Sequence, residues 1–227
     1  MKVISIILAR GGSKGLPNKN ILKINNKPLI SYSIKASLNS KYISKTIVSS
    51  DSQEIIDISK RCGAEILKRP EQLSGDEISS ETVISNVLDN ISNIDEYDYL
   101  VLLQPTSPLR NEKHIDEAFK IVFDTQAYSL ISCKKIDNAP LKAFMLDKNN
   151  YLRGISNNTY PFMRRQDLPP LFMPNGAIYI SRVNEFRKNL TLFSEKTMMY
   201  EMDNNSSIDI DNWDDLKIAE SLILEKC

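Results

Sequence analysis

A loop rich in glycine and cations follows the first apolar run of the chain. Residues 9–20 (ARGGSKGLPNKN) contain three glycines and three cations, namely Gly11, Gly12, Gly15, Arg10, Lys14 and Lys19. Glycine N–H groups can approach phosphate oxygens closely, and three cations can neutralise a triphosphate. The loop matches neither the Walker pattern nor the dinucleotide-binding pattern of glycines. From spacing alone it could therefore be a phosphate-binding loop or a solvated basic turn.

Two aspartates alternate with isoleucines in SIDID, residues 207–211. On a strand, Asp209 and Asp211 would share one face, about 7 Å apart along the chain, and Ile208 and Ile210 would share the other. Two carboxylates at that spacing can converge on one Mg²⁺, which usually takes one or two carboxylates plus substrate phosphates. Asp211 could instead be the N-cap of the helix that follows. Asp209 has no such alternative role and is the stronger candidate ligand.

The elements that would position these side chains alternate between strand and helix patterns. Strands are expected at 3–8, 46–50, 64–67, 99–104, 129–133, 175–181 and 197–202, and helices at 28–38, 52–63, 80–91, 112–124 and 213–226. Two of the strands, 3–8 and 99–104, are apolar at nearly every position, as in a parallel sheet that is covered on both faces. The pattern predicts a doubly wound, mostly parallel α/β sheet.

In open sheets of this kind, ligands bind beyond the carboxyl ends of the strands. Three informative loops would lie there: the glycine loop, the SSD stretch at 49–51, and QPTSPLR at 104–110. Residues 134–174 break the alternation because they hold five of the ten prolines. We expect this stretch to be an insertion of extended segments rather than another strand–helix unit.

The charge and cysteine content exclude several classes of protein. Acidic and basic side chains number 29 each, so the formal net charge of the 227 residues is zero. This balance argues against a general nucleic-acid or membrane-surface binder, because the chain has no net charge that would attract such a partner. Cys62, Cys133 and Cys227 form no Cys-x-x-Cys pair, which argues against zinc and disulfide frameworks. With no signal peptide or membrane run in the sequence, we expect a cytoplasmic protein.

Six stretches, in order, resemble the CMP-sialic acid synthetase family, also called acylneuraminate cytidylyltransferases. They are ARGGSKGLPNKN followed by Pro28-Leu29, RPEQLS (69–74), LLQPTSPLR (102–110), RRQDLP (164–169), NGAIYI (175–180) and SIDIDNWDDL (207–216). One such stretch would be weak evidence, but six in the family's order are specific. The resemblance runs from Ile6 to about Glu220, which is nearly the whole chain.

The resemblance implies a single domain over residues 1–227 with the nucleotide-diphospho-sugar transferase type of fold. Residues 134–174 would be an inserted dimerisation arm, and the protein a homodimer. The implied reaction transfers CMP from CTP to the anomeric hydroxyl of a nonulosonic acid, with N-acetylneuraminic acid the first choice, and releases pyrophosphate. Mg²⁺, or Mn²⁺, would be required. Legionaminic acid, pseudaminic acid and 3-deoxy-manno-octulosonate are the alternative acceptors. A glycosyltransferase, suggested by the D-x-D pattern, and a non-catalytic nucleotide-binding regulator are the rival functions.

The resemblance also assigns residues to the nucleotide. The CTP ligands would be Arg10, Gly12, Lys14, Lys19, Asn20, Arg69 and Ser80, with Asn20 at the ribose and the last two at the cytosine. Arg10 and Lys19 would act in catalysis together with Asp209 and Asp211, the two metal ligands. Arg69 could instead be a strand-end cation, and Ser80 could be a helix N-cap.

The acceptor sugar would contact Gln104, Arg165, Asn175, Tyr179 and Lys142. Arg165 would pair with the sugar carboxylate, a task that suits the planar guanidinium, although Arg164 is an alternative. Tyr179 could instead belong to the core. The family places the position of Lys142 near the active site of the neighbouring subunit. Leu192 precedes Phe193 where some relatives carry paired aromatics near the sugar, which keeps the alternative acceptors open.

Overall fold

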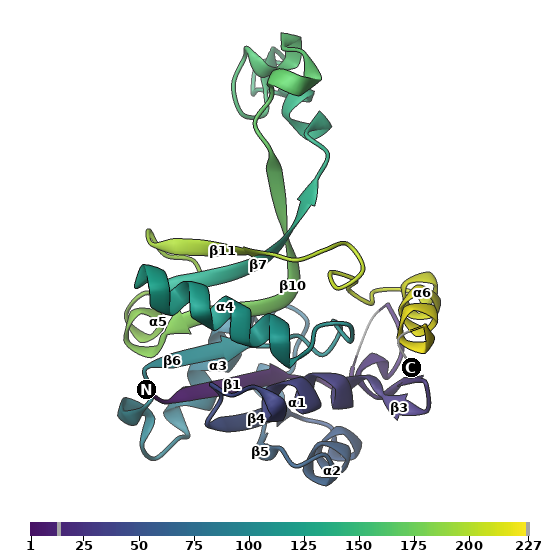
Figure 1. Cartoon of the computed structure of the whole chain (residues 1–227), viewed down its shortest axis with the longest axis vertical. Helices are drawn as coiled ribbons and strands as arrows, with labels where there is room; N and C mark the ends of the chain where they lie inside the picture. Colours follow the sequence, from purple (N-terminus) through teal and green to yellow (C-terminus); the bar gives the residue numbers. More distant parts are fainter. Residues whose placement is uncertain (13–14, 226–227) are drawn as a thin grey trace.

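The core of the molecule is a sheet of seven strands. The computed structural model describes residues 1–12 and 15–225. Within them the strands lie in the order β11-β7-β10-β6-β1-β4-β5, and neighbours are parallel except where β10 pairs with β6 and β7 (Figure 1). The strands are β1 (Val3–Leu8), β4 (Lys45–Ser50), β5 (Glu65–Lys68), β6 (Tyr99–Leu102), β7 (Ser129–Ile136), β10 (Leu171–Arg182) and β11 (Thr197–Glu201). The expectation of a mostly parallel sheet is confirmed.

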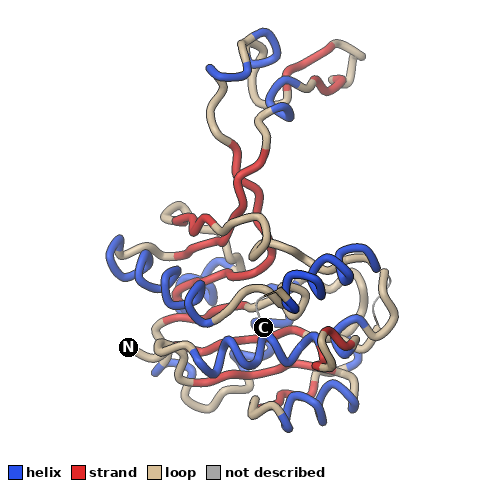
Figure 2. The backbone as a smooth tube through the Cα atoms, turned by 45° about the vertical axis from the view of Figure 1, so that its right-hand side comes forward, coloured by secondary structure: helices blue, strands red, loops and turns tan. Residues whose placement is uncertain are grey.

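Helices cover both faces of this sheet, as Figure 2 shows. They are α1 (Leu29–Asn39), α2 (Gln53–Arg61), α3 (Ser80–Asp89), α4 (Glu112–Thr125), α5 (Val183–Asn189) and α6 (Trp213–Leu224). Ile34 of α1, Ile55 of α2 and Phe119 of α4 belong to one buried cluster. Ile84 of α3 and Phe186 of α5 belong to a second cluster on the other face. The doubly wound arrangement is therefore confirmed.

The apolar runs of β1 and β6 have the expected cause. On β1, Val3 and Ile7 point into the first cluster, whereas Ile4 and Ile6 point into the second. All four side chains are fully buried. Successive residues of a strand face opposite sides of the sheet, so a strand covered on both sides is apolar at nearly every position, and Ser5 is the one polar residue of β1.

A third, smaller cluster joins the loops beside the sheet. It contains Leu16, Leu109 and Ile210, together with Ile24, Leu29, Ala219 and Ile223. Leu16 lies in the glycine loop, Leu109 in the 104–110 loop and Ile210 in SIDID, so three segments distant in sequence share one apolar anchor. A hairpin of β2 (Lys23–Ile24) and β3 (Lys27–Pro28) also contributes. Its turn residues, Asn25 and Asn26, have φ of 46° and 61°.

Several expected boundaries differ from the structure. Helix α1 begins at Leu29, after Pro28, and α2 ends at Arg61, before Gly63 with its φ of +94°. Helix α5 was not expected from the sequence, and residues 207–211 form no ladder, so the predicted strand there is wrong. No helix in the described part of the chain combines the length and apolar character that crossing a membrane requires.

The insertion is an arm that projects from the sheet (Figures 1 and 2). Strands β7 and β10 continue beyond the body as a two-stranded ribbon, with Leu171 opposite Ile136 and Pro174 opposite Cys133. The register shifts between Pro174 and Tyr179, where β10 enters the body. A hairpin of β8 (Phe144–Leu146) and β9 (Leu152–Gly154) lies at the far end. Residues 134–174 also hold three 3₁₀ turns but no α-helix, so the stretch is not another strand–helix unit, as expected.

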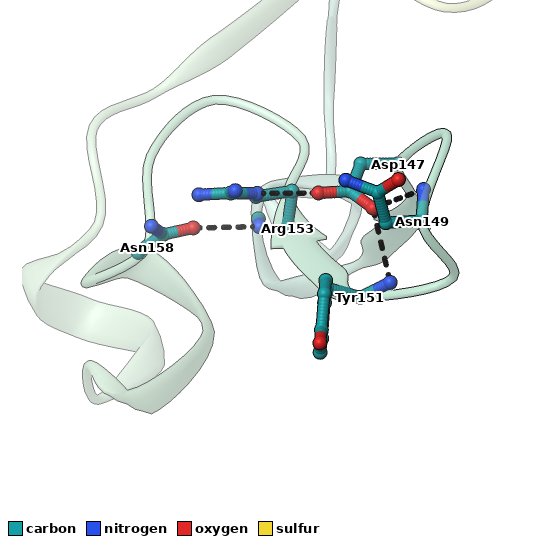
Figure 3. Close-up of polar contacts among 6 residues, drawn as sticks. Asp147, Asn149, Tyr151, Arg153 and Asn158 are labelled. Atoms are coloured by element: carbon teal, nitrogen blue, oxygen red, sulfur yellow. Dashed lines mark hydrogen bonds and ion pairs between the residues drawn. The ribbon is translucent and has the colours of Figure 1, made fainter.

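Polar contacts fold the end of the arm, as Figure 3 shows. Asp147 accepts hydrogen bonds from the backbone N–H groups of Asn149 and Tyr151, at 2.9 and 3.0 Å, and from Nε of Arg153 at 3.1 Å. The bonds from the Tyr151 and Asn149 backbones lower the pKa of the Asp147 carboxyl. Asn158 Oδ1 accepts from the N–H of Gly154 at 3.0 Å. The tip therefore has a defined turn of its own.

Candidate functional site

A cavity of about 710 Å³ opens at the carboxyl ends of the central strands. This is where an open α/β sheet binds its ligands, and the volume suits a nucleotide-sized molecule. Ten of the residues expected at the site line it: Arg10, Lys19, Asn20, Arg69, Ser80, Gln104, Asn175, Tyr179, Asp209 and Asp211. Gly12 is not among the lining residues, and Lys14 lies outside the residues that the structure describes.

The glycine loop is held from two sides. The N–H of Gly11 donates to Oδ1 of Asp51, at 2.9 Å, in the SSD stretch after β4. A Cβ on Gly15 would lie 2.8 Å from the carbonyl oxygen of Asp211, so the loop passes directly against the SIDID segment. A Cβ on Gly12 would meet no atom of the described residues beyond its chain neighbours within 4 Å. Close packing therefore requires a glycine at position 15, and no described contact requires one at position 12.

A 3₁₀ turn over Lys19–Ile21 follows the loop and aims two side chains at the cavity. The preceding Asn18 has a left-handed φ of 55°. Lys19 Nζ lies 3.0 Å from Oδ1 of Asp211. Asn20 is buried, and its amide nitrogen donates to the carbonyl oxygen of Arg10 at 3.0 Å. The turn thus links the first loop of the chain to the last acidic segment.

Two arginines mark the end of the cavity near β1 and β5. Arg10 forms an ion pair with Asp76. Arg69 is 6% exposed, and its guanidinium donates to the hydroxyl and the carbonyl oxygen of Ser49, at 3.2 and 2.9 Å. Burial lowers the pKa of Arg69, and the nearby Asp51 partly opposes this shift. Arg69 is therefore a fixed, preorganised donor group.

Ser80 lines the cavity as the first residue of α3. The N-cap is Ser79, whose hydroxyl accepts from the N–H of Thr82 at 3.2 Å. The reading of Ser80 as the cap is therefore wrong. Both residues are serines and either could have capped the helix, so the sequence alone did not separate them.

Asp209 and Asp211 both line the cavity, although no regular strand holds them. The alternation survives because Ile210 is fully buried and its N–H donates to the carbonyl oxygen of Thr106 at 2.9 Å. Asp211 is not a cap: Asn212 caps α6 in a capping box with Asp215. Desolvation by the surrounding protein raises the pKa of the Asp209 carboxyl, a hydrogen bond with the Thr106 side chain lowers it, and the Asp211 charge raises it further.

These two carboxylates fit a hard divalent cation. In the described part of the chain, no group of three or more His, Cys, Asp or Glu side chains gathers into a metal site. A pair of carboxylates suits Mg²⁺, which keeps several waters and takes further oxygens from substrate phosphates. Structural zinc needs four ligands and would not fit.

Gln104 lies at the far side of the aspartate pair, where β6 ends. Its carbonyl oxygen accepts from Ser33 Oγ at 3.0 Å and from Arg110 Nη2 at 3.3 Å. Arg110 is 1% exposed, and burial lowers the pKa of its guanidinium. Its Nε and Nη1 have no hydrogen-bond partner among the described residues. Sequence reasoning assigned no role to Arg110 or Thr106, although both lie in the quoted LLQPTSPLR stretch.

Asn175 and Tyr179 come from β10, whose register with β7 shifts between Pro174 and Tyr179. The amide of Asn175 accepts from Ser132 Oγ at 2.6 Å and donates to Ser207 Oγ at 2.9 Å, so it fixes the bend of β10. Tyr179 also lines a neighbouring cavity of about 280 Å³ with Leu192 and Phe193. Burial raises the pKa of Tyr179, and the Asp209 charge adds to the effect.

The cations expected at the sugar carboxylate lie on the arm and do not line this chain's own cavity. Lys142 Nζ donates to the carbonyl oxygen of Met163 at 2.7 Å. Arg165 Nη2 lies 3.3 Å from Oδ1 of Asp137, and Arg164 Nε lies 2.7 Å from Oδ2 of Asp167. Their roles at the sugar stay predictions.

Comparison with known proteins agrees with this geometry. The profile of the cytidylyltransferase family matches residues 4–224. An N-acylneuraminate cytidylyltransferase of Escherichia coli O18:K1:H7 is 36% identical over 226 residues, which are 99% of this chain and 53% of that protein. A pseudaminic acid cytidylyltransferase of Campylobacter jejuni is 33% identical over 224 residues, which are 98% of this chain and 96% of that protein.

The chain spans about half the length of the N-acylneuraminate cytidylyltransferases that it matches. A solved structure of CMP:2-keto-3-deoxy-manno-octonic acid synthetase complexed with CTP aligns over all of both chains, with a TM-score of 0.74 and 17% identity. That likeness shows a shared fold. The family profile and the nearly full-length match to the Campylobacter protein show that the chain belongs to the cytidylyltransferase family.

Proposed function

We propose that the protein transfers CMP from CTP to the anomeric hydroxyl of a nonulosonic acid and releases pyrophosphate. The observation that carries this proposal is the meeting, in one cavity, of the cationic glycine loop, the aspartate pair and Gln104. The names of the relatives, which act on N-acylneuraminic and pseudaminic acids, support the same reaction.

The nucleotide would lie at the β1 and β5 end of the cavity. Backbone N–H groups of the glycine loop, including that of Gly12, would face the phosphates with Arg10, Lys14 and Lys19. Asn20 would contact the ribose, and Arg69 and Ser80 would read the cytosine. Arg69 suits this task because its hydrogen bonds to Ser49 hold the guanidinium in one orientation.

Asp209 and Asp211 would hold Mg²⁺ or Mn²⁺, which when bound supplies positive charge to the phosphates. The sugar hydroxyl would attack the α-phosphorus in line with the leaving pyrophosphate. The contribution of this chain is to place the two reactants and to stabilise the charge that develops on the leaving group. Lys19 lies beside Asp211 and suits the second task.

The acceptor would lie on the other side of Gln104, towards Asn175 and Tyr179. The neighbouring 280 Å³ cavity, lined in part by Tyr179, Leu192 and Phe193, offers room for substituents of the acceptor. This room favours a nine-carbon acid with acyl groups over 3-deoxy-manno-octulosonate. We place N-acetylneuraminic acid first, and legionaminic and pseudaminic acids are the alternatives.

We also propose that the protein is a homodimer joined through its arm. Large apolar side chains of the arm are exposed: Phe144, Met145, Leu146, Tyr151, Leu152, Ile155 and Phe162. Phe162 is 82% exposed, and such a cluster on a projecting segment is typical of an interface. A second copy would cover it, and the arm of each copy would bring Lys142 and Arg165 to the cavity of the other.

The two described cysteines, Cys62 and Cys133, are free. Free thiols support the cytoplasmic location that we propose, because oxidising compartments favour disulfides. Cys227 lies outside the described residues.

The test is incubation of the protein with CTP, Mg²⁺ and single nonulosonic acids, followed by pyrophosphate assay and mass analysis of the product. We expect a CMP-sugar with at least one of N-acetylneuraminic, legionaminic and pseudaminic acid, and none when CTP is replaced by ATP. Product only with 3-deoxy-manno-octulosonate would reassign the acceptor. Absence of product with every acid would refute the proposed reaction.

A further inference from the structure

Lys134 is a cavity-lining cation to which the sequence motifs assign no role. It lies on β7, at the point where the ribbon of the arm leaves the sheet, opposite Met173 of β10. Both residues line the 710 Å³ cavity. Lys134 is half-buried, and it lines the cavity from the arm side.

The other cations of this cavity are already engaged by protein groups. Arg10 pairs with Asp76, Lys19 pairs with Asp211, and the guanidinium of Arg69 is bonded to Ser49. Of the cavity-lining cations in residues 1–12 and 15–225, Lys134 is the one for which the structure shows no hydrogen bond or ion pair. An ammonium in a cavity with no partner is available to a ligand anion.

The position of Lys134 decides which anion it can reach. In the sheet, β7 is separated from β1 by β10 and β6. Three strand spacings correspond to roughly 14 Å, so the β7 side lies well away from the glycine loop that follows β1. Gln104, at the end of β6, lies between them. Lys134 is therefore on the acceptor side of the cavity.

Its neighbours fix this orientation. Ser132 lies two residues earlier on β7, hence on the same face of the strand, and its hydroxyl bonds to Asn175. A Cβ on Gly176 would lie 3.5 Å from Oδ2 of Asp209 and 4.0 Å from Cγ of Gln104, so the next residue of β10 touches the reacting end of the cavity. Lys134 therefore lies on the side of β7 that faces Asn175, and the residue after Asn175 contacts Asp209 and Gln104, beside which we place the acceptor.

We infer that Lys134 binds the carboxylate of the acceptor within the same chain and so selects an acidic sugar. This inference rests on the proposed function, because it names the acceptor of that reaction. The ammonium of lysine is a compact charge with three rotatable donors, so it can pair with one oxygen of the acceptor carboxylate. Arg165 and Lys142 of this chain do not line this cavity, and in the proposed dimer they would reach the cavity of the other copy, so Lys134 is the carboxylate contact that the chain supplies to its own acceptor.

The test compares Lys134→Met with Lys135→Met. Lys135 is the adjacent residue of β7 and points to the opposite face, and its side chain is exposed, so the control makes the same charge change outside the cavity. Loss of one charge-assisted hydrogen bond should raise the acceptor KM on the order of 10- to 100-fold in Lys134→Met. The CTP KM should stay within about twofold, and Lys135→Met should match the wild type. Lys134→Arg should recover part of the loss.

A second measurement isolates the carboxylate. With an acceptor analogue whose carboxylate is replaced by a carboxamide, the wild type and Lys134→Met should bind equally weakly in calorimetry. An unchanged acceptor KM in Lys134→Met, or a rise in the CTP KM instead, would overturn the inference while the proposed reaction stood. If the wild type bound no nonulosonic acid at all, both the role of Lys134 and the proposed reaction would be refuted.

Discussion

The ammonium of Lys19 lies 3.0 Å from Oδ1 of Asp211, although 192 residues separate them in the chain. The contact brings a cation of the first loop to a carboxylate of the last extended segment. Gly15 supports it, because the absence of a Cβ lets the loop pass the backbone of Asp211. One wall of the cavity is thus held by an ion pair between the loop that follows β1 and the segment that precedes α6.

Replacing Lys19 should weaken the use of CTP. In Lys19→Ala we expect the CTP KM to rise about tenfold, because one charge-assisted contact to phosphate is lost. The free energy of unfolding should change by less than about 1 kcal/mol, because Asp211 is 73% exposed and such pairs contribute little. Steady-state kinetics at varied CTP measures the first effect. Lys23→Ala, at an exposed position of β2, is the control, and equal CTP dependence in both variants would remove Lys19 from the site.

Asp209 should be required for turnover but not for folding. In Asp209→Asn we expect kcat to fall on the order of 100-fold or more, because one of two metal-binding carboxylates is lost. The carboxylate is desolvated in the cavity, as its raised pKa indicates, so the neutral amide should not destabilise the fold. Turnover at saturating Mg²⁺ and the thermal midpoint are the two measurements. Asp214→Asn, at a strongly exposed position of α6, should leave both unchanged. Near-normal turnover of Asp209→Asn would contradict the metal assignment.

Arg110 should contribute to stability through its volume and through the hydrogen bonds that its Nη2 donates to Ser33 Oγ, at 2.6 Å, and to the carbonyl oxygen of Gln104, at 3.3 Å. In Arg110→Ala we expect the free energy of unfolding to fall by about 2–4 kcal/mol, because the substitution leaves a cavity and removes buried hydrogen bonds. Arg110→Met should cost less than Arg110→Ala, because methionine refills most of the volume that alanine leaves empty. Urea denaturation of both variants provides the comparison. Equal losses in the two would show that the charge, rather than the volume, dominates.

The arm should be the site of dimerisation. In Phe162→Glu, a charge replaces the most exposed large apolar side chain, and we expect the protein to run as a monomer in light scattering at micromolar concentration. Leu38→Glu, at an exposed apolar position of α1, should leave the mass unchanged. A monomeric wild type, or a dimeric Phe162→Glu, would argue against the proposed interface.

The parts of the fold that the sequence predicted best are those where one physical demand dominates. Strands β1 and β6 had to be apolar on both faces, and their pattern allowed no other reading. Helix α5 was missed because only Val183 and Phe186 of its seven residues are buried, which is too short a pattern to show helical periodicity.

Site residues could be predicted from the sequence where their types and spacing imply a chemical role. They could not be predicted where only strand pairing in the folded protein brings a residue to the cavity. Asp209, Asp211 and the glycine loop carry their chemistry in their own sequence. Lys134 is an ordinary lysine at the start of an insertion, and it lines the cavity only because β7 pairs with β10, whose Met173 comes 39 residues later. The strand expected at 207–211 did not form because Ile210 bonds to the Thr106 loop instead of to a neighbouring strand.

The ribbon of the arm connects the cavity to the proposed dimer interface. Strands β7 and β10 line the wall of the cavity and continue into the arm, so Lys134 and Asn175 stand on the two strands that carry the tip. In the proposed dimer, the arm of each copy completes the acceptor half of the other copy's cavity. Turnover per chain should therefore fall when the protein is diluted far enough for the dimer to dissociate.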